Sequence, residues 1–194
     1  APEVAAVTLA ALDVLEDEHL AARAEAVLWV EPGSHADSRA LGAVRERLRG
    51  TFNVVAPCVH ADACGVLAPG CERHWCHNFA APPPGLLAQA HWAEFARRLG
   101  IDLLRVPYAF LALERKGRAR PATWEGGERI VGEPRLYKGF AKIFCCGTAG
   151  VRDLTLQKRD APALFKRLKD EDRVLLLRGE SAGEKLTNVT ATLP

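Results

Sequence analysis

Two short apolar runs with an amphipathic segment between them dominate the first 56 residues. The runs lie at 26–30 (AVLWV), which stops at a Pro-Gly exit, and at 52–56 (FNVVA). Between them, residues 34–48 place apolar side chains at helical spacing, and either Ser34 or Asp37 can cap this helix. This strand–helix–strand order is typical of an α/β sheet covered on both faces.

A second helical pattern and a further strand follow. Residues 85–99 (GLLAQAHWAEFARRL) carry an apolar stripe and predict a helix, and 106–114 (VPYAFLALE) predict a strand that pairs with 52–56. Residues 57–84, which lie between the strand at 52–56 and this helix, contain too many Gly, Pro and Cys residues for regular structure. We therefore expect 57–84 to be an insertion between two neighbouring strands. Upstream, a short helix is expected at 17–26.

Beyond residue 128 the pattern changes to short strands around one basic helix. Strands are predicted at 129–137, 139–146, 151–158, 173–178 and 185–193, with the helix at 161–169. The expected organisation is an α/β domain at 1–115, a linker at 116–128 and a small basic β-rich domain at 129–194.

The uneven distribution of charge adds a candidate partner. The 194 residues carry a net charge of only +2. Residues 1–50 hold 5 basic and 9 acidic side chains, whereas 97–178 hold 19 basic and 10 acidic ones. Such a bias is expected of a surface that faces a polyanion such as RNA, and equally of an ordinary solvated surface. No apolar run approaches the length of a membrane span, so no membrane partner is expected.

Cysteines gather in one stretch of the insertion. Cys58, Cys64, Cys71 and Cys76 fall within 19 residues, and His60, His74 and His77 are interleaved with them. No secretory signal opens the sequence, so reduced thiols or metal ligands are more plausible than disulfides. Inert buried thiols explain one cysteine easily, but four in so short a turn-rich stretch favour a metal or cluster site.

The spacing of these cysteines differs from the tight CxxC knuckle of structural zinc sites. Irregular spacing with a remote ligand suits an iron–sulfur cluster, because its cysteines can come from distant parts of the chain. Zinc held by three cysteines and one histidine stays open as an alternative. Cys145 and Cys146 lie in a predicted strand, so they point to opposite faces and only one is expected to reach the site. A cysteine nucleophile is less favoured, since nothing marks a base beside one thiol.

At these motifs the chain resembles the methyltransferase-like small-ribosomal-subunit proteins, the family of the mitochondrial small-subunit protein 22 and its bacterial relatives. The resemblance covers most of the chain. It is carried by these segments: WVEPGS (29–34), SRALGAVRERL (38–48), VVAPCVHADAC (54–64), WCHNF (75–79), YAFLALER (108–115), GEPRLYKGFAKIFCCGTAG (132–150) and LTLQKRD (154–160). Val59, Gly65 and Asn78 depart from the family pattern, and the loop before Trp75 is longer.

The resemblance implies a fold and a ligand set. The fold is α/β, with part of a class I methyltransferase-like (Rossmann-like) sheet, the cysteine-rich insertion and the small β-rich module. The ligands of a four-iron (4Fe-4S) cluster would be Cys58, Cys64, Cys76 and Cys146, with Cys71 as the rival for the third position. S-adenosylmethionine is expected only in a longer form, because no Gly-rich loop opens a helix in residues 1–30. Whether the chain is an enzyme is left open.

The resemblance also implies partners. We expect a protein of small-ribosomal-subunit assembly or translation, with rRNA and ribosomal proteins as partners and no DNA, in a bacterial cytoplasm or the mitochondrial matrix. A methyltransferase acting on RNA and a zinc-stabilised interaction module are the alternatives. The candidate phosphate contacts are basic side chains of the β-rich module: Arg135, Lys138, Lys142, Arg152, Lys158, Arg159, Lys166, Arg167 and Lys169.

Overall fold

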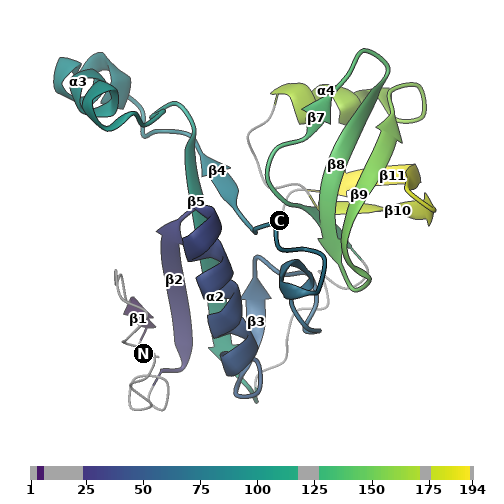
Figure 1. Ribbon diagram of the computed structural model, residues 1–194, viewed down its shortest axis with the longest axis horizontal. Helices are drawn as coiled ribbons and strands as arrows, with labels where there is room; N and C mark the ends of the chain where they lie inside the picture. Colours follow the sequence, from purple (N-terminus) through teal and green to yellow (C-terminus); the bar gives the residue numbers. More distant parts are fainter. Residues whose placement is uncertain (1–3, 7–23, 118–126, 171–175, 193–194) are drawn as a thin grey trace.

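The computed structural model describes residues 4–6, 24–117, 127–170 and 176–192. It is an α/β protein with two separate sheets, which lie side by side with the cysteine-rich loop between them (Figure 1). Most of the helix expected at 17–26 and most of the linker expected at 116–128 fall outside the described residues, and Ala26 begins strand β2 instead of ending a helix.

The first sheet has the order β1-β2-β5-β3, and β4 extends it along β5. Its strands are β1 (Val4–Ala6), β2 (Ala26–Pro32), β3 (Phe52–Ala56), β4 (Asn78–Ala80) and β5 (Val106–Arg115). β1 and β2 are parallel, and β5 runs antiparallel to both β2 and β3. The predicted pairing of 106–114 with 52–56 is therefore confirmed, and the cysteine-rich segment lies between strands that are neighbours in the sheet.

Helix α2 (His35–Leu48) covers one face of this sheet. Ser34 caps it by accepting a hydrogen bond from the Asp37 backbone N–H at 3.1 Å. The helix packs Leu41 and Val44 onto the sheet. The buried cluster beneath it comprises Trp29, Leu41, Val44, Phe52, Val54, Ala109, Leu111 and Leu113.

The helix predicted at 85–99 is shorter and less buried than expected. It begins as a 3₁₀ turn, η3 (Leu86–Ala88), and continues as α3 (Ala90–Leu99), which has no buried residue. Phe95 and Leu99 of the apolar stripe are 43% and 58% exposed. The stripe does not reach the core, because α3 lies beyond the end of the sheet where β4 pairs with β5 (Figure 1).

The second sheet closes into a five-stranded barrel. The order β6-β10-β11-β9-β8 closes through an additional β6–β8 pairing, and β7 adds to the free half of β8. The predicted strand 129–137 is wrong as a single element, because it is divided into β6 and β7. The elements are β6 (Glu128–Ile130), β7 (Arg135–Leu136), β8 (Phe140–Gly147), β9 (Gly150–Gln157), α4 (Pro162–Asp170), β10 (Leu176–Ala182) and β11 (Lys185–Thr192).

The interior of the barrel is apolar and α4 covers one end of it. Ala141, Ile143 and Cys145 of β8 are fully buried, and Leu154 and Leu156 of β9 face them. Leu164, Phe165 and Leu168 of α4 complete the cluster. The barrel therefore has its own core, separate from the core beneath α2. The division of the chain into domains at the predicted boundaries stays a prediction.

Candidate metal centre

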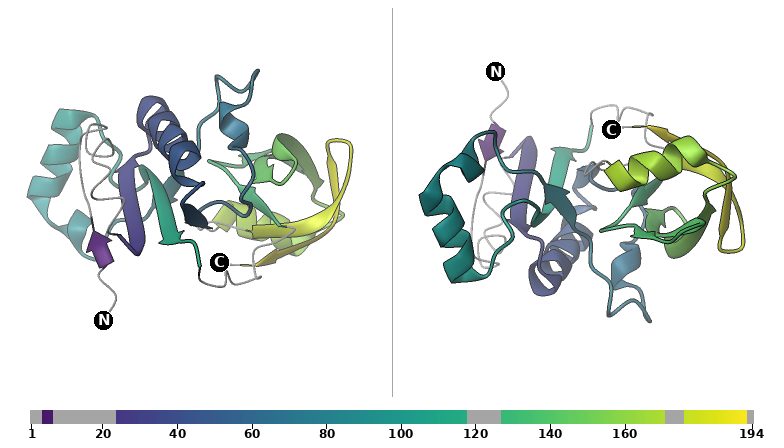
Figure 2. Two further views of the ribbon diagram at one scale, coloured as in Figure 1. Left: turned by 90° about the horizontal axis from the view of Figure 1, so that it is seen from below. Right: turned by 90° about the horizontal axis from the view of Figure 1, so that it is seen from above.

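The cysteine-rich loop lies between α2 and the barrel in both views of Figure 2. It leaves the end of β3 at Pro57, forms the 3₁₀ turn η2 (Gly65–Leu67) and returns to the sheet at β4. Apart from η2 it contains no helix or strand between β3 and β4, so polar contacts from its neighbours must fix its path.

Three side chains of α2 fix the loop from the sheet side. Arg39 Nη1 donates to the carbonyl oxygens of Val66, Cys71 and His74 at 2.6, 3.1 and 3.0 Å. Glu46 accepts the backbone N–H of Cys64 at 3.0 Å. Arg45 Nη2 donates to the His60 carbonyl at 3.1 Å. These contacts replace the backbone partners that an irregular segment lacks.

The barrel contacts the loop from the other side. The His74 ring stacks on Phe144 of β8, with ring centroids 4.2 Å apart. Gly65 lies so close to the β8–β9 turn that a Cβ atom there would stand 2.8 Å from the Val151 backbone nitrogen. Gly132 donates its N–H to the His77 carbonyl at 3.2 Å. The loop is thus packed between the two sheets along much of its length.

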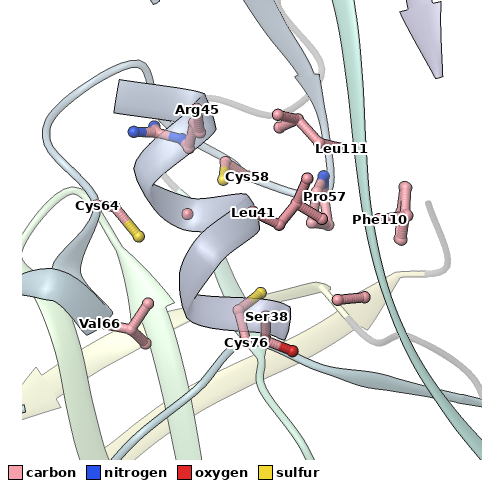
Figure 3. A pocket seen from close by; sticks show the side chains of 12 residues that line it. Ser38, Leu41, Arg45, Pro57, Cys58, Cys64, Val66, Cys76, Phe110 and Leu111 are labelled. Carbon is pink, nitrogen blue, oxygen red and sulfur yellow. The ribbon is translucent and has the colours of Figure 1, made fainter. Parts of the chain in front are cut away.

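Four of the six thiols meet in this junction. Cys58, Cys64 and Cys76 line a cavity of about 30 Å³ beside α2, together with Leu41, Arg45 and Val66 (Figure 3). Cys146 enters from β8, and its Sγ lies 3.5 Å from Nε2 of the buried His60. A negative charge on any of the other three thiols would raise the pKa of Cys146, because all four face the same junction.

The remaining two cysteines lie elsewhere. Cys145 points into the barrel and belongs to its apolar core, as alternation along a strand requires. Cys71 is partly exposed and does not line the cavity. The structure therefore brings together the four predicted ligands and separates the two spare thiols from them, while the identity of the ligands stays a prediction.

Two buried arginines accompany the thiols. Arg45 and Arg129 are only 2% and 3% exposed. Arg129 lies opposite Cys146 in the β6–β8 pairing, and its guanidinium donates to Cys76 Sγ and to Asn78 Oδ1. Arg45 forms an ion pair with Glu46. Buried guanidinium groups are costly unless anions or acceptors surround them, and here a carboxylate, an amide oxygen, a backbone carbonyl and a sulfur provide such partners.

The thiols themselves are weak acids in this environment. Burial raises the pKa of Cys64 to about 11 and the pKa of Cys146 to about 12, and it also raises the pKa of Cys58. Arg45 and Arg129 act in the opposite direction. Cys58, Cys64 and Cys146 are therefore harder to deprotonate than ordinary thiols, and a metal that binds them must displace their protons.

The spacing of the donors differs from that of a single-ion site. Within the part of the chain that the structure describes, no three His, Cys, Asp or Glu side chains are close enough to hold one metal ion. A tetrahedral zinc needs its sulfurs about 2.3 Å from one point. A multi-iron cluster puts one iron behind each cysteine and so spreads the four sulfurs further apart. No spacing of the sulfurs that would identify a cluster is established by this, so the nature of a bound metal group stays a prediction.

Sequence reasoning missed the two arginines. Arg45 had a signal: it lies four residues after Leu41, on the apolar stripe of α2, where a charged side chain needs an explanation. Nothing in the sequence pointed to Arg129, because its position opposite Cys146 depends on the register of β6 against β8.

The predicted phosphate contacts lie on the barrel and around α4. Lys138, Lys158, Arg159 and Lys166 are exposed, and Arg167 is half-buried. Arg135 is 55% exposed and pairs with Asp153, while Lys142 lies 3.4 Å from Glu184. The Lys158 ammonium lies over the Phe165 ring, 5.6 Å from its centroid. Among the described helices, none is long and apolar enough to cross a membrane.

Comparison with known proteins adds one finding. A family model described as "Mitochondrial small ribosomal subunit Rsm22" matches residues 12–173. This span includes the whole loop, both arginines and the barrel as far as α4. No curated protein matches the chain.

Proposed function

The chain belongs to the mitochondrial small ribosomal subunit Rsm22 family, and from this premise we propose that it is a small-ribosomal-subunit-associated protein whose two sheets are joined by a four-iron cluster. The proposed ligands are Cys58, Cys64, Cys76 and Cys146. The role of the cluster is structural, and the partners are rRNA and proteins of the subunit. The family description names the mitochondrial subunit, which supports the mitochondrial matrix among the compartments expected from the sequence.

One observation carries the proposal. Three thiols of the cysteine-rich loop and one thiol of β8 converge where the sheet meets the barrel, and two buried guanidinium groups accompany them. Thiolates bound to iron would leave net negative charge in the junction, and Arg45 and Arg129 would balance it. A cluster bound there would cross-link residues 58 and 146. Metal binding to a site that the unfolded chain lacks contributes to the free energy of folding.

The arrangement of the first sheet supports a finer proposal, that it is methyltransferase-like. β2 and β3 both run against β5 and are therefore parallel to each other, and α2 connects them. A helical crossover between parallel strands is the repeating unit of doubly wound sheets. Binding of S-adenosylmethionine stays a prediction for a longer form, and calorimetric titration with the cofactor tests it.

Anaerobic purification tests the cluster. The protein should be brown and contain iron and acid-labile sulfide in equal amounts, close to four of each per chain for a cubane. Cys76→Ser should lose most of both, whereas Cys71→Ser, the matched control from the same loop, should keep them. A colourless protein with one zinc per chain would replace the proposal with the zinc alternative.

A filter-binding assay with small-subunit rRNA tests the association. Phosphate contacts by the basic side chains of the barrel should make affinity fall steeply with salt, by roughly 0.7–0.9 logarithmic units per contact for each tenfold rise in salt. Affinity that does not fall with rising salt would contradict an electrostatic contact with RNA.

A further inference from the structure

The connectivity of the barrel indicates what its outer face is suited to bind. Taken in chain order, the five closing strands are β6, β8, β9, β10 and β11, with α4 between the third and the fourth. Strand β6, the first of them, pairs with β8 and with β10. Strand β9, the third, pairs in parallel with β11, the fifth. A five-stranded barrel in which the face of strands 2 and 3 and the loops 1–2 and 4–5 bind oligonucleotides is the OB-fold. Here those parts are β8, β9, residues 131–139 and the turn at 183–184.

Side chains on the outer face of β8 and β9 fit such a role. Because Ala141, Ile143 and Cys145 face the core, Phe140, Lys142 and Phe144 face outward. Their partners on β9 are polar: Gln157 opposite Phe140, Thr155 opposite Lys142 and Asp153 opposite Phe144. The outer face thus carries aromatic rings among polar and cationic groups.

The two ends of this face differ. At one end the ring of Phe144 is covered, because His74 of the cysteine-rich loop stacks on it. At the other end Phe140 stacks with Tyr137, with ring centroids 4.5 Å apart and planes 12° apart, and Tyr137 is 49% exposed. The covered end belongs to the junction, and the exposed pair offers a flat ring to a partner.

Basic side chains surround the exposed pair. Residues 135–159 carry six basic side chains and one acidic one. Arg135 and Lys142 are register partners across β7 and β8, and Lys138 lies in the turn between Tyr137 and Phe140. The N–H of Lys158 donates to the Gly139 carbonyl at 3.0 Å, which brings a further lysine beside the same turn. The ion pairs of Arg135 and Lys142 with Asp153 and Glu184 are partly exposed, and such pairs are worth only about 0–1 kcal/mol. Phosphates can therefore compete for these two cations.

We propose that Tyr137 and Phe140 form a stacking platform for unpaired bases of single-stranded RNA, with Arg135, Lys138 and Lys142 contacting the flanking phosphates. This proposal rests on the proposed association with rRNA and adds to it which face of the barrel binds and which form of RNA it takes. Aromatic rings beside a cationic track are the usual means by which proteins hold single strands without reading their sequence. A duplex hides the faces of its bases and offers nothing to such a platform.

Fluorescence anisotropy with a labelled oligouridine 12-mer, and with an RNA duplex of the same length, tests this proposal on the full chain. Tyr137→Leu should weaken binding of the single strand roughly 5- to 100-fold, the range expected for loss of one stacked base, and leave the duplex unchanged. Lys138→Gln should weaken both RNAs and reduce the salt slope. Tyr108→Leu is the matched control, because Tyr108 is the other tyrosine of the chain and stacks with Phe110 on β5, outside the barrel.

The outcomes separate this proposal from the broader function. If wild type binds rRNA but Tyr137→Leu and Tyr108→Leu bind the single strand equally well, the platform is wrong and the association with rRNA stands. If Tyr137→Leu binds both RNAs as wild type does but no longer co-sediments with small ribosomal subunits, the exposed pair contacts a protein and the proposal is overturned. If wild type binds no RNA at all, the proposed association with rRNA is wrong, and the stacking platform is wrong with it.

Discussion

Cys145 and Cys146 are adjacent in sequence but lie in two regions with different surroundings, one apolar and one polar. Cys145 lies in the barrel core, among buried apolar side chains of the strands and of α4. Cys146 lies in the junction, where thiols and two buried guanidinium groups surround a small cavity. The barrel core is complete by hydrophobic burial alone. The junction, by contrast, holds two buried guanidinium groups beside its thiols, so its stability depends on polar partners as well as on burial.

We therefore expect the junction, and not the barrel core, to depend on the proposed cluster. Removing a cluster should leave the barrel core intact and loosen the loop, because only the loop relies on it. Substitutions in the core should have the opposite effect.

Leu156→Ala should destabilise the barrel by about 2–5 kcal/mol, because Leu156 is fully buried and its loss leaves a cavity. Hydrogen exchange of the β8 and β9 amides should report this loss. Iron and sulfide per folded chain should stay at the wild-type level. Leu136→Ala on β7 is the control, since Leu136 is 39% exposed. A large loss of iron from folded Leu156→Ala would mean that the two regions are not separate.

Gly65→Ala should separate the loop from the barrel at a cost of about 1–3 kcal/mol, because the added methyl would overlap the backbone of Gly150 and Val151. Limited proteolysis should then cut the loop faster, with the barrel amides unchanged. Gly50→Ala offers a control, because nothing lies within 4 Å of a Cβ atom at that position. Equal cleavage of the two variants would contradict the close approach.

Arg39→Gln should have the smallest effect, about 1–2 kcal/mol, since its three hydrogen bonds to the loop are partly exposed. The loop amides near residues 66–74 should exchange faster. Arg47→Gln, an exposed arginine of the same helix, should match wild type. If both variants exchange alike, α2 does not hold the loop through Arg39.

The pattern of apolar and polar residues predicted those helices and strands well that have a buried face. Helix α2, its Ser34 cap and the strands β2, β3 and β5 follow from apolar spacing and turn residues. The helix predicted at 85–99 is present over 90–99, but its apolar stripe does not reach the core. The pattern failed at 129–137, because two short strands that pair with different halves of β8 look like one strand in sequence.

The candidate cysteine ligands of the site could be named from the sequence, but the residues that surround them could not. Strand alternation alone predicted that Cys145 and Cys146 diverge, and the structure places them on opposite faces of β8. The convergence of Cys146 with Cys58, Cys64 and Cys76 depends on how the barrel meets the sheet, which no local pattern encodes. Closure of the barrel and the place of Arg129 depend on the same long-range pairing.

The central claim is that a cluster links the loop to the barrel through Cys146, and the adjacent thiols offer the most direct test. Iron and sulfide should be measured in anaerobically purified Cys145→Ala and Cys146→Ala, with circular dichroism to normalise for folded protein. The account predicts near wild-type content in Cys145→Ala and loss of most iron and sulfide in Cys146→Ala. Equal content in the two variants, or the reverse order, would contradict it.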